Sequence, residues 1–293
     1  MSTRIHFIGV GKMGLPMARH LAAAGHAVTV SDASAQRGQL AQARGLTLAP
    51  DVPRAIAAAR VIFSSLPHDA ALLSVATQVA ADATSGAIFV DTSTVSQAAS
   101  ADAAQRCTAA GVHCLRSTVS GNNKMAEAAE LTVMVSGPKA AYDKVLPLLR
   151  AFGPKLFYLG DAEQARLMKL VVNLMIAQTS AMLSEALTLG RKGGLDWRDM
   201  WQVLGASAVG SPIVQAKAVQ LSERDFTPTF TVEQMLKDLE LILGAGAASQ
   251  VPLAQTAMTY QLMQAAAAQG DALDDYAAII KVVERSAGLP DRL

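Results

Sequence analysis

Short apolar runs recur along the first half of the chain, and Ala-rich stretches of helical length separate several of them. Runs that are apolar at successive residues are typical of strands buried on both faces of a sheet. The clearest helical stretches span residues 12–24, 69–80 and 96–109. This alternation predicts an α/β domain with a doubly wound, mostly parallel sheet, whose closely spaced last strands can pair antiparallel. The runs read RIHFIGV, AVTVSD, VIFSSL, AIFVDTS, VHCLRS, LTVMVSG and KLFYLG.

The pattern changes after Gly160. Residues 162–288 contain no strand-like run, only long segments rich in Ala, Leu and Met that are interrupted by turn sequences such as GRKGG and SQVP. These segments predict an all-α domain. We therefore predict two domains, 1–160 and 161–293, the second opening with a long helix that joins them. Asp161 followed by Gln164 is typical of a helix N-terminal cap and predicts the start of that helix.

One stretch, residues 170–190, is apolar and long enough to resemble a membrane span. Asn173, Gln178 and Glu185 interrupt it and Lys169 precedes it, so a long buried helix is the better interpretation. No charged start followed by an apolar core, the mark of a signal peptide, precedes the first predicted strand.

Composition narrows the classes of partner. The chain has 293 residues, of which 51% are hydrophobic, enough to bury a large core. The formal net charge is +1 and the chain has no basic run, which argues against nucleic acid as the main partner. Such a core needs no disulfide, so we expect reduced thiols at Cys107 and Cys114 and a cytoplasmic protein. No histidine has metal-ligand spacing, and no metal site is predicted.

A glycine motif follows the first predicted strand. GVGKMG places Gly9, Gly11 and Gly14 between that strand and a helix. In a dinucleotide site these glycines allow a tight turn, close approach of the backbone to the pyrophosphate, and close packing of helix on strand. Asp32 ends the next predicted strand, 18 residues beyond Gly14, where the acid that binds the ribose hydroxyls is expected. This context predicts a Rossmann-type NAD(P)-binding domain.

Asp32 also bears on the choice of cofactor. A carboxylate at this position accepts a hydrogen bond from the ribose 2′-OH and repels a 2′-phosphate, which favours NAD over NADP. Arg37 is the one nearby cation, and we interpret it as a solvated helix residue. We predict NAD as the preferred cofactor and leave NADP open.

Several further motifs, in the right order, resemble the β-hydroxyacid dehydrogenase family, which includes 3-hydroxyisobutyrate dehydrogenase and tartronate semialdehyde reductase. The resemblance covers essentially the whole chain. Residues 7–32, FIGVGKMGLPMARHLAAAGHAVTVSD, are similar to the family's opening. SLP at 65–67 and DTST at 91–94 are similar to its cofactor loops, and VSG at 119–121 to its substrate loop. Lys169 with Asn173 resembles the catalytic lysine and a nearby asparagine, and Phe230 through Lys237-Asp238 resembles a segment whose lysine approaches the cofactor.

The resemblance implies an enzyme that transfers hydride reversibly between the nicotinamide cofactor and a small, 3-hydroxyisobutyrate-like 3-hydroxy acid or its semialdehyde. It also points to a homodimer or homotetramer, for which the helical domain would suit an interface. The implied catalytic residues are Lys169, Asn173 and Ser120, and the implied substrate-binding residues are Ser120, Gly121, Asn122, Lys169 and Asn173. The implied cofactor-binding residues are Gly9, Gly11, Lys12, Met13, Gly14, Asp32, Leu66, Pro67, Ser93, Thr94 and Lys237.

The sequence departs from the family at two motifs. Residues 116–122 read RSTVSGN where the family usually reads DAPVSGG, so Asn122 replaces the second glycine. Val172-Asn173 stands where a pair of asparagines is common. These departures leave the reaction type in place and put the family's usual substrates in question.

The chemistry requires a proton carrier beside the cofactor. Lys169 and Asn173 are four residues apart and share one face of the predicted helix. A lysine whose pKa is lowered by burial, or by a second cation such as Lys237, can carry the proton. Ser120, with the backbone N–H groups that follow it, can hold an anionic or hydroxyl group of the substrate. Structural interpretations stand beside these: Lys169 extends to solvent at a domain edge, Ser120 is a turn serine, and Lys237 lies on a solvated helix face.

Two other functions stay open. Imine reductases share this architecture but usually lack a lysine at the position of Lys169, and related non-catalytic dinucleotide-binding modules have lost it. The presence of Lys169, Asn173 and Ser120 therefore favours the dehydrogenase. We interpret Trp197 and Trp201 as helix packing and Glu163 and Arg166 as surface charges.

Overall fold

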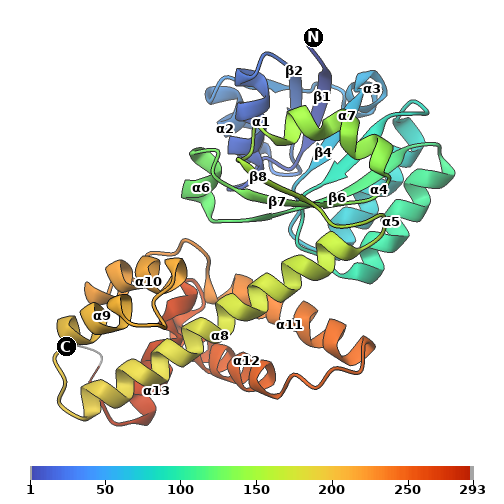
Figure 1. Ribbon diagram of the computed structural model, residues 1–293. Helices are drawn as coiled ribbons and strands as arrows, with labels where there is room; N and C mark the ends of the chain where they lie inside the picture. Colours follow the sequence, from blue (N-terminus) through green and yellow to red (C-terminus); the bar gives the residue numbers. More distant parts are fainter. Residues whose placement is uncertain (1, 291–293) are drawn as a thin grey trace. The chain divides into compact units, whose positions relative to one another are not determined.

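The computed structural model describes residues 2–290. It divides into two compact units, Met1–Lys169 and Leu170–Leu293. The division falls inside helix α8 (Gln164–Lys192), which runs unbroken from the first unit into the second (Figure 1). The sequence prediction had placed the domain boundary at residue 160.

The first unit is built on an eight-stranded sheet in the order β3-β2-β1-β4-β5-β6-β7-β8. All neighbouring strands pair parallel except β6 and β7, which pair antiparallel. The strands are β1 (Arg4–Ile8), β2 (Ala27–Ser31), β3 (Thr47–Leu48), β4 (Val61–Ser64), β5 (Ile88–Asp91), β6 (His113–Ser120), β7 (Thr132–Ser136) and β8 (Lys155–Tyr158). The seven predicted strands and the doubly wound α/β class are confirmed, whereas the two-residue β3 carries no apolar run and was missed.

The antiparallel prediction for the last strands is right for β7 and wrong for β8. Helix α7 (Lys139–Leu149) lies between β7 and β8. It returns the chain to the edge of the sheet at which β7 begins, so β8 runs in the same direction as β7. A strand that follows such a crossover pairs parallel with its predecessor. The sequence pattern predicts no helix in this connection.

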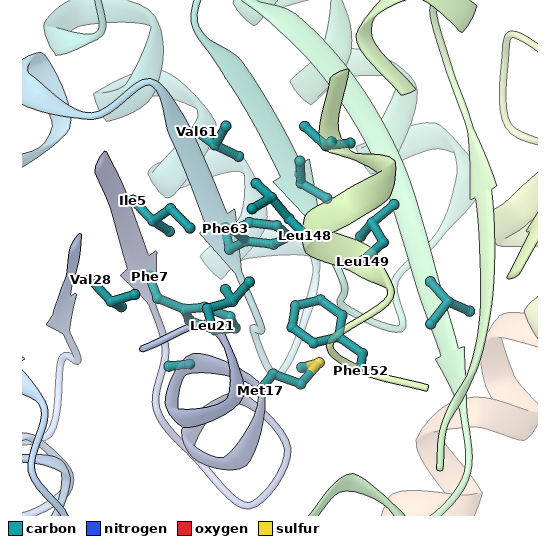
Figure 2. Packing of buried hydrophobic residues seen from close by; sticks show 14 of the residues in the cluster. Ile5, Phe7, Met17, Leu21, Val28, Val61, Phe63, Leu148, Leu149 and Phe152 are labelled. Carbon is teal, nitrogen blue, oxygen red and sulfur yellow. The ribbon is translucent and has the colours of Figure 1, made fainter. Parts of the chain in front are cut away.

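Strands β1, β4, β5 and β6 contribute residues to two different cores. One core joins the sheet to α7 and to α1 (Gly14–Ala23), α2 (Ala35–Ala43) and α6 (Asn123–Glu127). In it Phe7 and Phe63 stack at 5.7 Å between ring centroids, and Phe152 meets the Phe63 ring edge-on at 5.6 Å (Figure 2). The other core joins the sheet to α3 (Val52–Ala58), α4 (Asp69–Asp82) and α5 (Gln97–Ala109). Each fully buried Phe or Leu contributes about 1.5–3 kcal/mol, so these layers hold the loops above them in place.

A histidine lies fully buried among hydroxyl groups in β1. His6 Nδ1 is 2.9 Å from Thr29 Oγ1, and its Nε2 is 3.0 Å from Ser31 Oγ. Burial lowers the pKa of His6 from 6.5 to about 4. The ring is therefore neutral in the folded protein at neutral pH, with both nitrogens beside hydroxyl partners.

The second unit is helical. Besides the greater part of α8 it contains α9 (Trp197–Ala206), α10 (Pro212–Ser222), α11 (Val232–Ala248), α12 (Ala254–Ala266), a π turn (Ala267–Asp271), a 3₁₀ turn (Tyr276–Ala278) and α13 (Ile279–Ser286). Its described residues form no strand, only an isolated bridge between Thr231 and Asp275. The Trp197 and Trp201 rings are buried and meet edge to face at 6.1 Å, which confirms their packing role.

Helix α8 is long and apolar enough to cross a membrane by length and composition alone, with 44% of its most apolar window buried inside the protein. A core helix of a soluble protein meets the same criterion, so the observation is weak evidence for a membrane. The predicted cap at Asp161 is wrong, because the helix begins at Gln164. The Gln164 side chain instead accepts a hydrogen bond from the Ala162 backbone N–H at 2.8 Å.

Candidate active site

The glycine motif forms a tight turn between β1 and α1. Gly9 has φ +89°, and its N–H donates to the Ser31 carbonyl at 2.8 Å. A Cβ on Gly14 would lie 1.9 Å from the Gly9 oxygen, so only glycine lets α1 begin so close to this turn. At Gly11 a Cβ would meet nothing nearer than the Arg37 guanidinium at 3.6 Å, so the backbone there is open to a ligand. The turn fits the pyrophosphate of a dinucleotide.

The Asp32 carboxylate is held in a fixed orientation beside this turn. Its Oδ2 accepts the Val10 N–H and its Oδ1 accepts the Ser34 N–H, both at 2.8 Å. Arg37 is exposed, as predicted, although its guanidinium lies next to Gly11. The carboxylate predicted to bind the ribose therefore adjoins the predicted phosphate loop.

The loops after β4 and β5 lie next to the glycine turn. A Cβ on Gly9 would lie 2.3 Å from the Ser65 oxygen, so the loop after β4 packs directly on the turn. The Leu66 N–H donates to Ser93 Oγ at 2.8 Å, which joins the two loops. Because these loops follow the carboxyl ends of adjacent parallel strands, they meet at one edge of the sheet, where such folds bind dinucleotides.

The other predicted cofactor residues of the first unit have varied surroundings. Met13 is half-buried against the first core, Thr94 is half-buried, and Lys12 and Pro67 are exposed. The last predicted cofactor residue, Lys237, lies on α11 in the second unit.

The Ser120 loop begins at the end of β6, next to β5 in the sheet. Ser120 pairs with Thr132 of β7, and Gly121 follows with φ +138°. Asn122 is the N-cap of α6, because its Oδ1 accepts the Met125 N–H at 3.0 Å. The amide that replaces the family's second glycine is thus engaged in capping a short helix. Ser120 lies at the same carboxyl edge of the sheet as the cofactor loops.

The start of α8 is anchored to β6 and β7. Thr118 Oγ1 donates to the Ala165 carbonyl at 2.9 Å, and Ser136 Oγ donates to the Ala162 carbonyl at 2.7 Å. The Ala165 N–H in turn donates to Ser136 Oγ at 3.1 Å. Lys169 lies half-buried one turn beyond Ala165. The backbone that carries the predicted catalytic lysine is therefore held by the sheet.

The prediction that Glu163 and Arg166 are surface charges is wrong. Arg166 is 2% exposed and forms an ion pair with Asp91 that is 1% exposed on both sides. It also donates to the Ser93 carbonyl, and its Nε donates to Ser100 Oγ at 3.0 Å. The signal in the sequence was Asp91, a carboxylate at the end of an apolar run that requires a cation when buried. Nothing in the sequence identifies Arg166 as that cation.

A second ion pair, between a buried arginine and a half-buried glutamate, reaches the same end of α8. Arg116 Nε donates to Glu163 Oε1 at 2.7 Å, and the two side chains are 9% and 15% exposed. Arg116 opens the motif that in the family usually begins with aspartate, and Glu163 balances its positive charge.

In the second unit Asn173 is oriented by Asp238. Both are buried, and Asn173 Nδ2 donates to Asp238 Oδ2. The other Asp238 oxygen lies 2.9 Å from Lys237 Nζ, an ion pair rather than an aligned hydrogen bond. The predicted Asn173 and Lys237 are thus brought together through a carboxylate that was not predicted as a site residue. Lys169 and Asn173 are one turn apart on continuous α8, as predicted.

A cavity of about 440 Å³ in the first unit lies away from these groups. Its lining includes Arg4, Ala27 and Thr47, at the amino-terminal ends of β1, β2 and β3. The glycine turn lies at the opposite ends of β1 and β2, so this cavity is unrelated to the predicted cofactor site. Among residues 2–290, no three His, Cys, Asp or Glu side chains gather to hold a metal ion.

The fold and the glycine turn define a dinucleotide-binding protein of the Rossmann type, and comparison with known proteins specifies its kind. Residues 4–160 match the family model described as the NAD binding domain of 6-phosphogluconate dehydrogenase. Residues 164–283 match the model described as NAD-binding of NADP-dependent 3-hydroxyisobutyrate dehydrogenase.

Individual relatives are also named as dehydrogenases or reductases. The chain is 34% identical to 2-(hydroxymethyl)glutarate dehydrogenase of Eubacterium barkeri, over 98% of this chain and 97% of the relative. It is 28% identical to glyoxylate/succinic semialdehyde reductase 2 of Arabidopsis thaliana, over 96% and 79%. A solved structure of Mycobacterium tuberculosis 3-hydroxyisobutyrate dehydrogenase with L-serine matches with a TM-score of 0.89 at 28% identity, over 97% and 99%.

The chain therefore belongs to the β-hydroxyacid dehydrogenase family. It is an NAD(P)-dependent dehydrogenase that acts on the CH–OH group of hydroxy acids. The prediction of this family and reaction class is confirmed.

Proposed function

We propose that the chain interconverts small 3-hydroxy acids and their semialdehydes, with Lys169 as the proton carrier. When bound, the nicotinamide supplies or accepts the hydride. The chain must then hold the substrate and move one proton to or from the reacting oxygen. Relatives named for 3-hydroxy acids, a 2-(hydroxymethyl)glutarate dehydrogenase and 3-hydroxyisobutyrate dehydrogenases, support this substrate class.

The observation that carries the proposal is the position of Lys169 on α8. It is half-buried, directly follows the turn anchored to β6 and β7, and precedes Asn173 by one helical turn. In reduction Lys169 Nζ gives a proton to the carbonyl oxygen, and in oxidation it takes the proton from the hydroxyl. Asn173, oriented by Asp238, positions the lysine or the substrate oxygen.

Ser120 would hold the substrate's carboxylate. It is the last residue of β6, where the sheet fixes it opposite Thr132, and Gly121 then turns the backbone with φ +138°. A hydroxyl and a backbone N–H fixed in this way can donate to an anion without reorganising. The capping bond of Asn122 keeps the following turn rigid.

A substrate panel tests the proposal. The purified protein is assayed with 3-hydroxyisobutyrate, the semialdehyde of 3-hydroxyisobutyrate, 2-(hydroxymethyl)glutarate and L-serine, with lactate as a control that lacks a 3-hydroxyl group. We expect kcat/KM for the best 3-hydroxy acid or semialdehyde to exceed that for lactate by about 100-fold, since a misplaced hydroxyl leaves site groups without partners. Equal rates for lactate, or turnover of none of the four, would contradict the substrate class.

We propose that NAD is preferred over NADP. The support is Asp32, whose carboxylate is fixed by two backbone N–H groups and would repel a 2′-phosphate. We expect kcat/KM to favour NAD by at least about 10-fold, and Asp32→Ala to reduce that ratio. Arg37→Gln serves as the control, because Arg37 is the cation next to Gly11. A preference for NADP that Arg37→Gln removes would refute the assignment and identify Arg37 as the phosphate-binding residue.

We also propose that the helical unit joins copies of the chain into a homodimer or homotetramer. Met175, Met182 and Leu189 are 63%, 57% and 76% exposed and follow one another at seven-residue intervals on α8. This spacing places them on one face, the pattern by which helices pair. Light scattering on the purified protein should give at least a dimer, and Met182→Glu should weaken it; a monomeric wild type contradicts the proposal.

A further inference from the structure

We propose that Arg166 is a positioning residue that fixes the start of α8, and with it Lys169, to the cofactor loop at Ser93. This inference rests on the proposed role of Lys169. It assigns a function to a buried cation that the reaction itself does not use.

Arg166 reaches three partners in the first unit from one side chain. Its two terminal nitrogens donate to the Asp91 carboxylate and the Ser93 carbonyl, and its Nε donates to Ser100 Oγ. Asp91 ends β5, Ser93 belongs to the loop after it, and Ser100 lies on α5. The planar guanidinium suits this arrangement because its five donors are spread over three nitrogens. A lysine ammonium has all of its donors on one nitrogen and cannot reach the three partners together.

Asp91 passes the constraint on to two cofactor loops. Its Oδ1 accepts hydrogen bonds from Ser64 Oγ at 2.5 Å and from Ser93 Oγ at 2.6 Å. Ser93 Oγ also accepts the Leu66 N–H. One carboxylate therefore holds the ends of β4 and β5 and the loops that follow them, and Arg166 holds that carboxylate.

The spacing along α8 makes this network relevant to the lysine. Arg166 precedes Lys169 by three residues, so both lie on neighbouring positions of one helical turn. A rotation or shift of α8 that moves Lys169 would pull Arg166 away from Asp91. That movement would leave a buried charge without its counter-ion, which is strongly unfavourable. The lysine and the loop at Ser93 are thus held in one register.

Arg116 offers a matched control for this proposal. Like Arg166 it is a buried arginine in an ion pair at the start of α8, with Glu163 as its partner. Its other side-chain bond among residues 2–290 is to the Cys114 carbonyl, at 3.4 Å, within its own strand. The Arg116 backbone lies beside Asp91 in the sheet, but its guanidinium forms none of the hydrogen bonds that hold the loops after β4 and β5 in the described part of the chain.

The test compares Arg166→Lys with Arg116→Lys in the full-length protein. Both variants keep a cation beside the buried carboxylate, so both should fold, with a similar fall in Tm. We measure kcat for 2-(hydroxymethyl)glutarate and the Kd for NADH by fluorescence. Arg166→Lys should lower kcat by about 30-fold and raise the Kd for NADH by about 10-fold. The reason is that Lys169 and the loop at Ser93 are then no longer held in a fixed position relative to each other. Arg116→Lys should leave both values within about two-fold of wild type.

Equal losses of kcat and NADH affinity in the two variants, or normal values in Arg166→Lys, would overturn the positioning role. The NADH arm does not depend on the substrate assignment. If the wild type fails to turn over 2-(hydroxymethyl)glutarate, this proposal is still decided by the Kd for NADH. If Lys169→Ala keeps a normal kcat, the proposed function fails, and the claim that Arg166 positions that lysine fails with it.

Discussion

The dinucleotide loops of the first unit and the Asn173 group of the second are built by opposite means. At Gly9, Gly11 and Gly14 the backbone forms the predicted cofactor turn. An added side chain would clash with neighbouring backbone at Gly9 and Gly14. At Asn173 the site consists of side chains, with Asp238 fixing the amide and pairing with Lys237. A backbone site can fail by steric clash and a side-chain site by loss of charge or orientation. Substitutions of each kind can test this difference.

Among the substitutions that test this difference, the largest effect is expected in the glycine turn. Gly14→Ala places a Cβ 1.9 Å from the Gly9 oxygen, so the turn must move. We expect the free energy of unfolding to fall by about 3 kcal/mol, as for overpacked cores, together with loss of NADH binding. Urea denaturation and NADH titration measure the two effects.

Gly11→Ala is the control for that prediction. Its Cβ meets only the flexible Arg37 side chain at 3.6 Å, so stability should change by less than about 0.5 kcal/mol while NADH affinity falls. Normal NADH binding in Gly11→Ala would break the assignment of this turn to the pyrophosphate.

A smaller effect is expected at Asp238. Asp238→Asn removes the charged acceptor that orients the Asn173 amide. We expect kcat to fall by about 10-fold, because a charge-assisted hydrogen bond contributes about 1.5–3 kcal/mol. KM for the cofactor should rise as well, because Asp238 also pairs with Lys237. Steady-state kinetics with both substrates varied measure the two changes.

Glu240→Gln is a matched acid-to-amide change on the same helix. Glu240 is exposed. Within residues 2–290 its side chain accepts a hydrogen bond from the Tyr260 hydroxyl alone. Its kcat should equal that of the wild type. A similar loss of kcat in both variants would show that Asp238 acts through helix stability rather than through Asn173.

The smallest expected effect is the loss of stability that the buried His6 causes in the first unit as the pH falls. The pKa of His6 is about 4 in the folded protein against 6.5 for an ordinary histidine. Between these values the unfolded chain binds the additional proton, so stability is full above pH 6.5 and is lost as pH falls toward 4. At pH 5.5 the loss from this group is about 1 kcal/mol. Urea denaturation at pH 5.5 and 7.5 should show it in the wild type, while His6→Asn should lack this component; an identical pH dependence in both would contradict it.

The sequence predicted the first unit well because backbone geometry leaves a local record. A glycine triplet after an apolar run, with Asp32 at the end of the next strand, describes the turn almost completely. The strands were equally visible, since a sheet buried on both faces requires apolar residues at successive positions. Only β3, two residues long, was too short to leave such a pattern.

Pairs of side chains that are far apart in the sequence cannot be recognised from a local pattern. Arg166 and Asp91 are 75 residues apart, and Arg116 and Glu163 are 47 apart. Each charged residue taken alone is most often exposed, which is why Glu163 and Arg166 were read as surface charges. Likewise, Asn122 departs visibly from the family pattern, but its capping role depends on where α6 begins. The catalytic roles of Lys169, Asn173 and Ser120 remain predictions.

The most direct test of the central claim is Lys169→Ala, compared with wild type for reduction of the semialdehyde of 3-hydroxyisobutyrate and for NADH affinity. If Lys169 carries the proton, kcat should fall by about 10³-fold, because general acid–base catalysis contributes about 10²–10⁴, while the Kd for NADH stays within about two-fold. A near-normal kcat in Lys169→Ala would contradict the account.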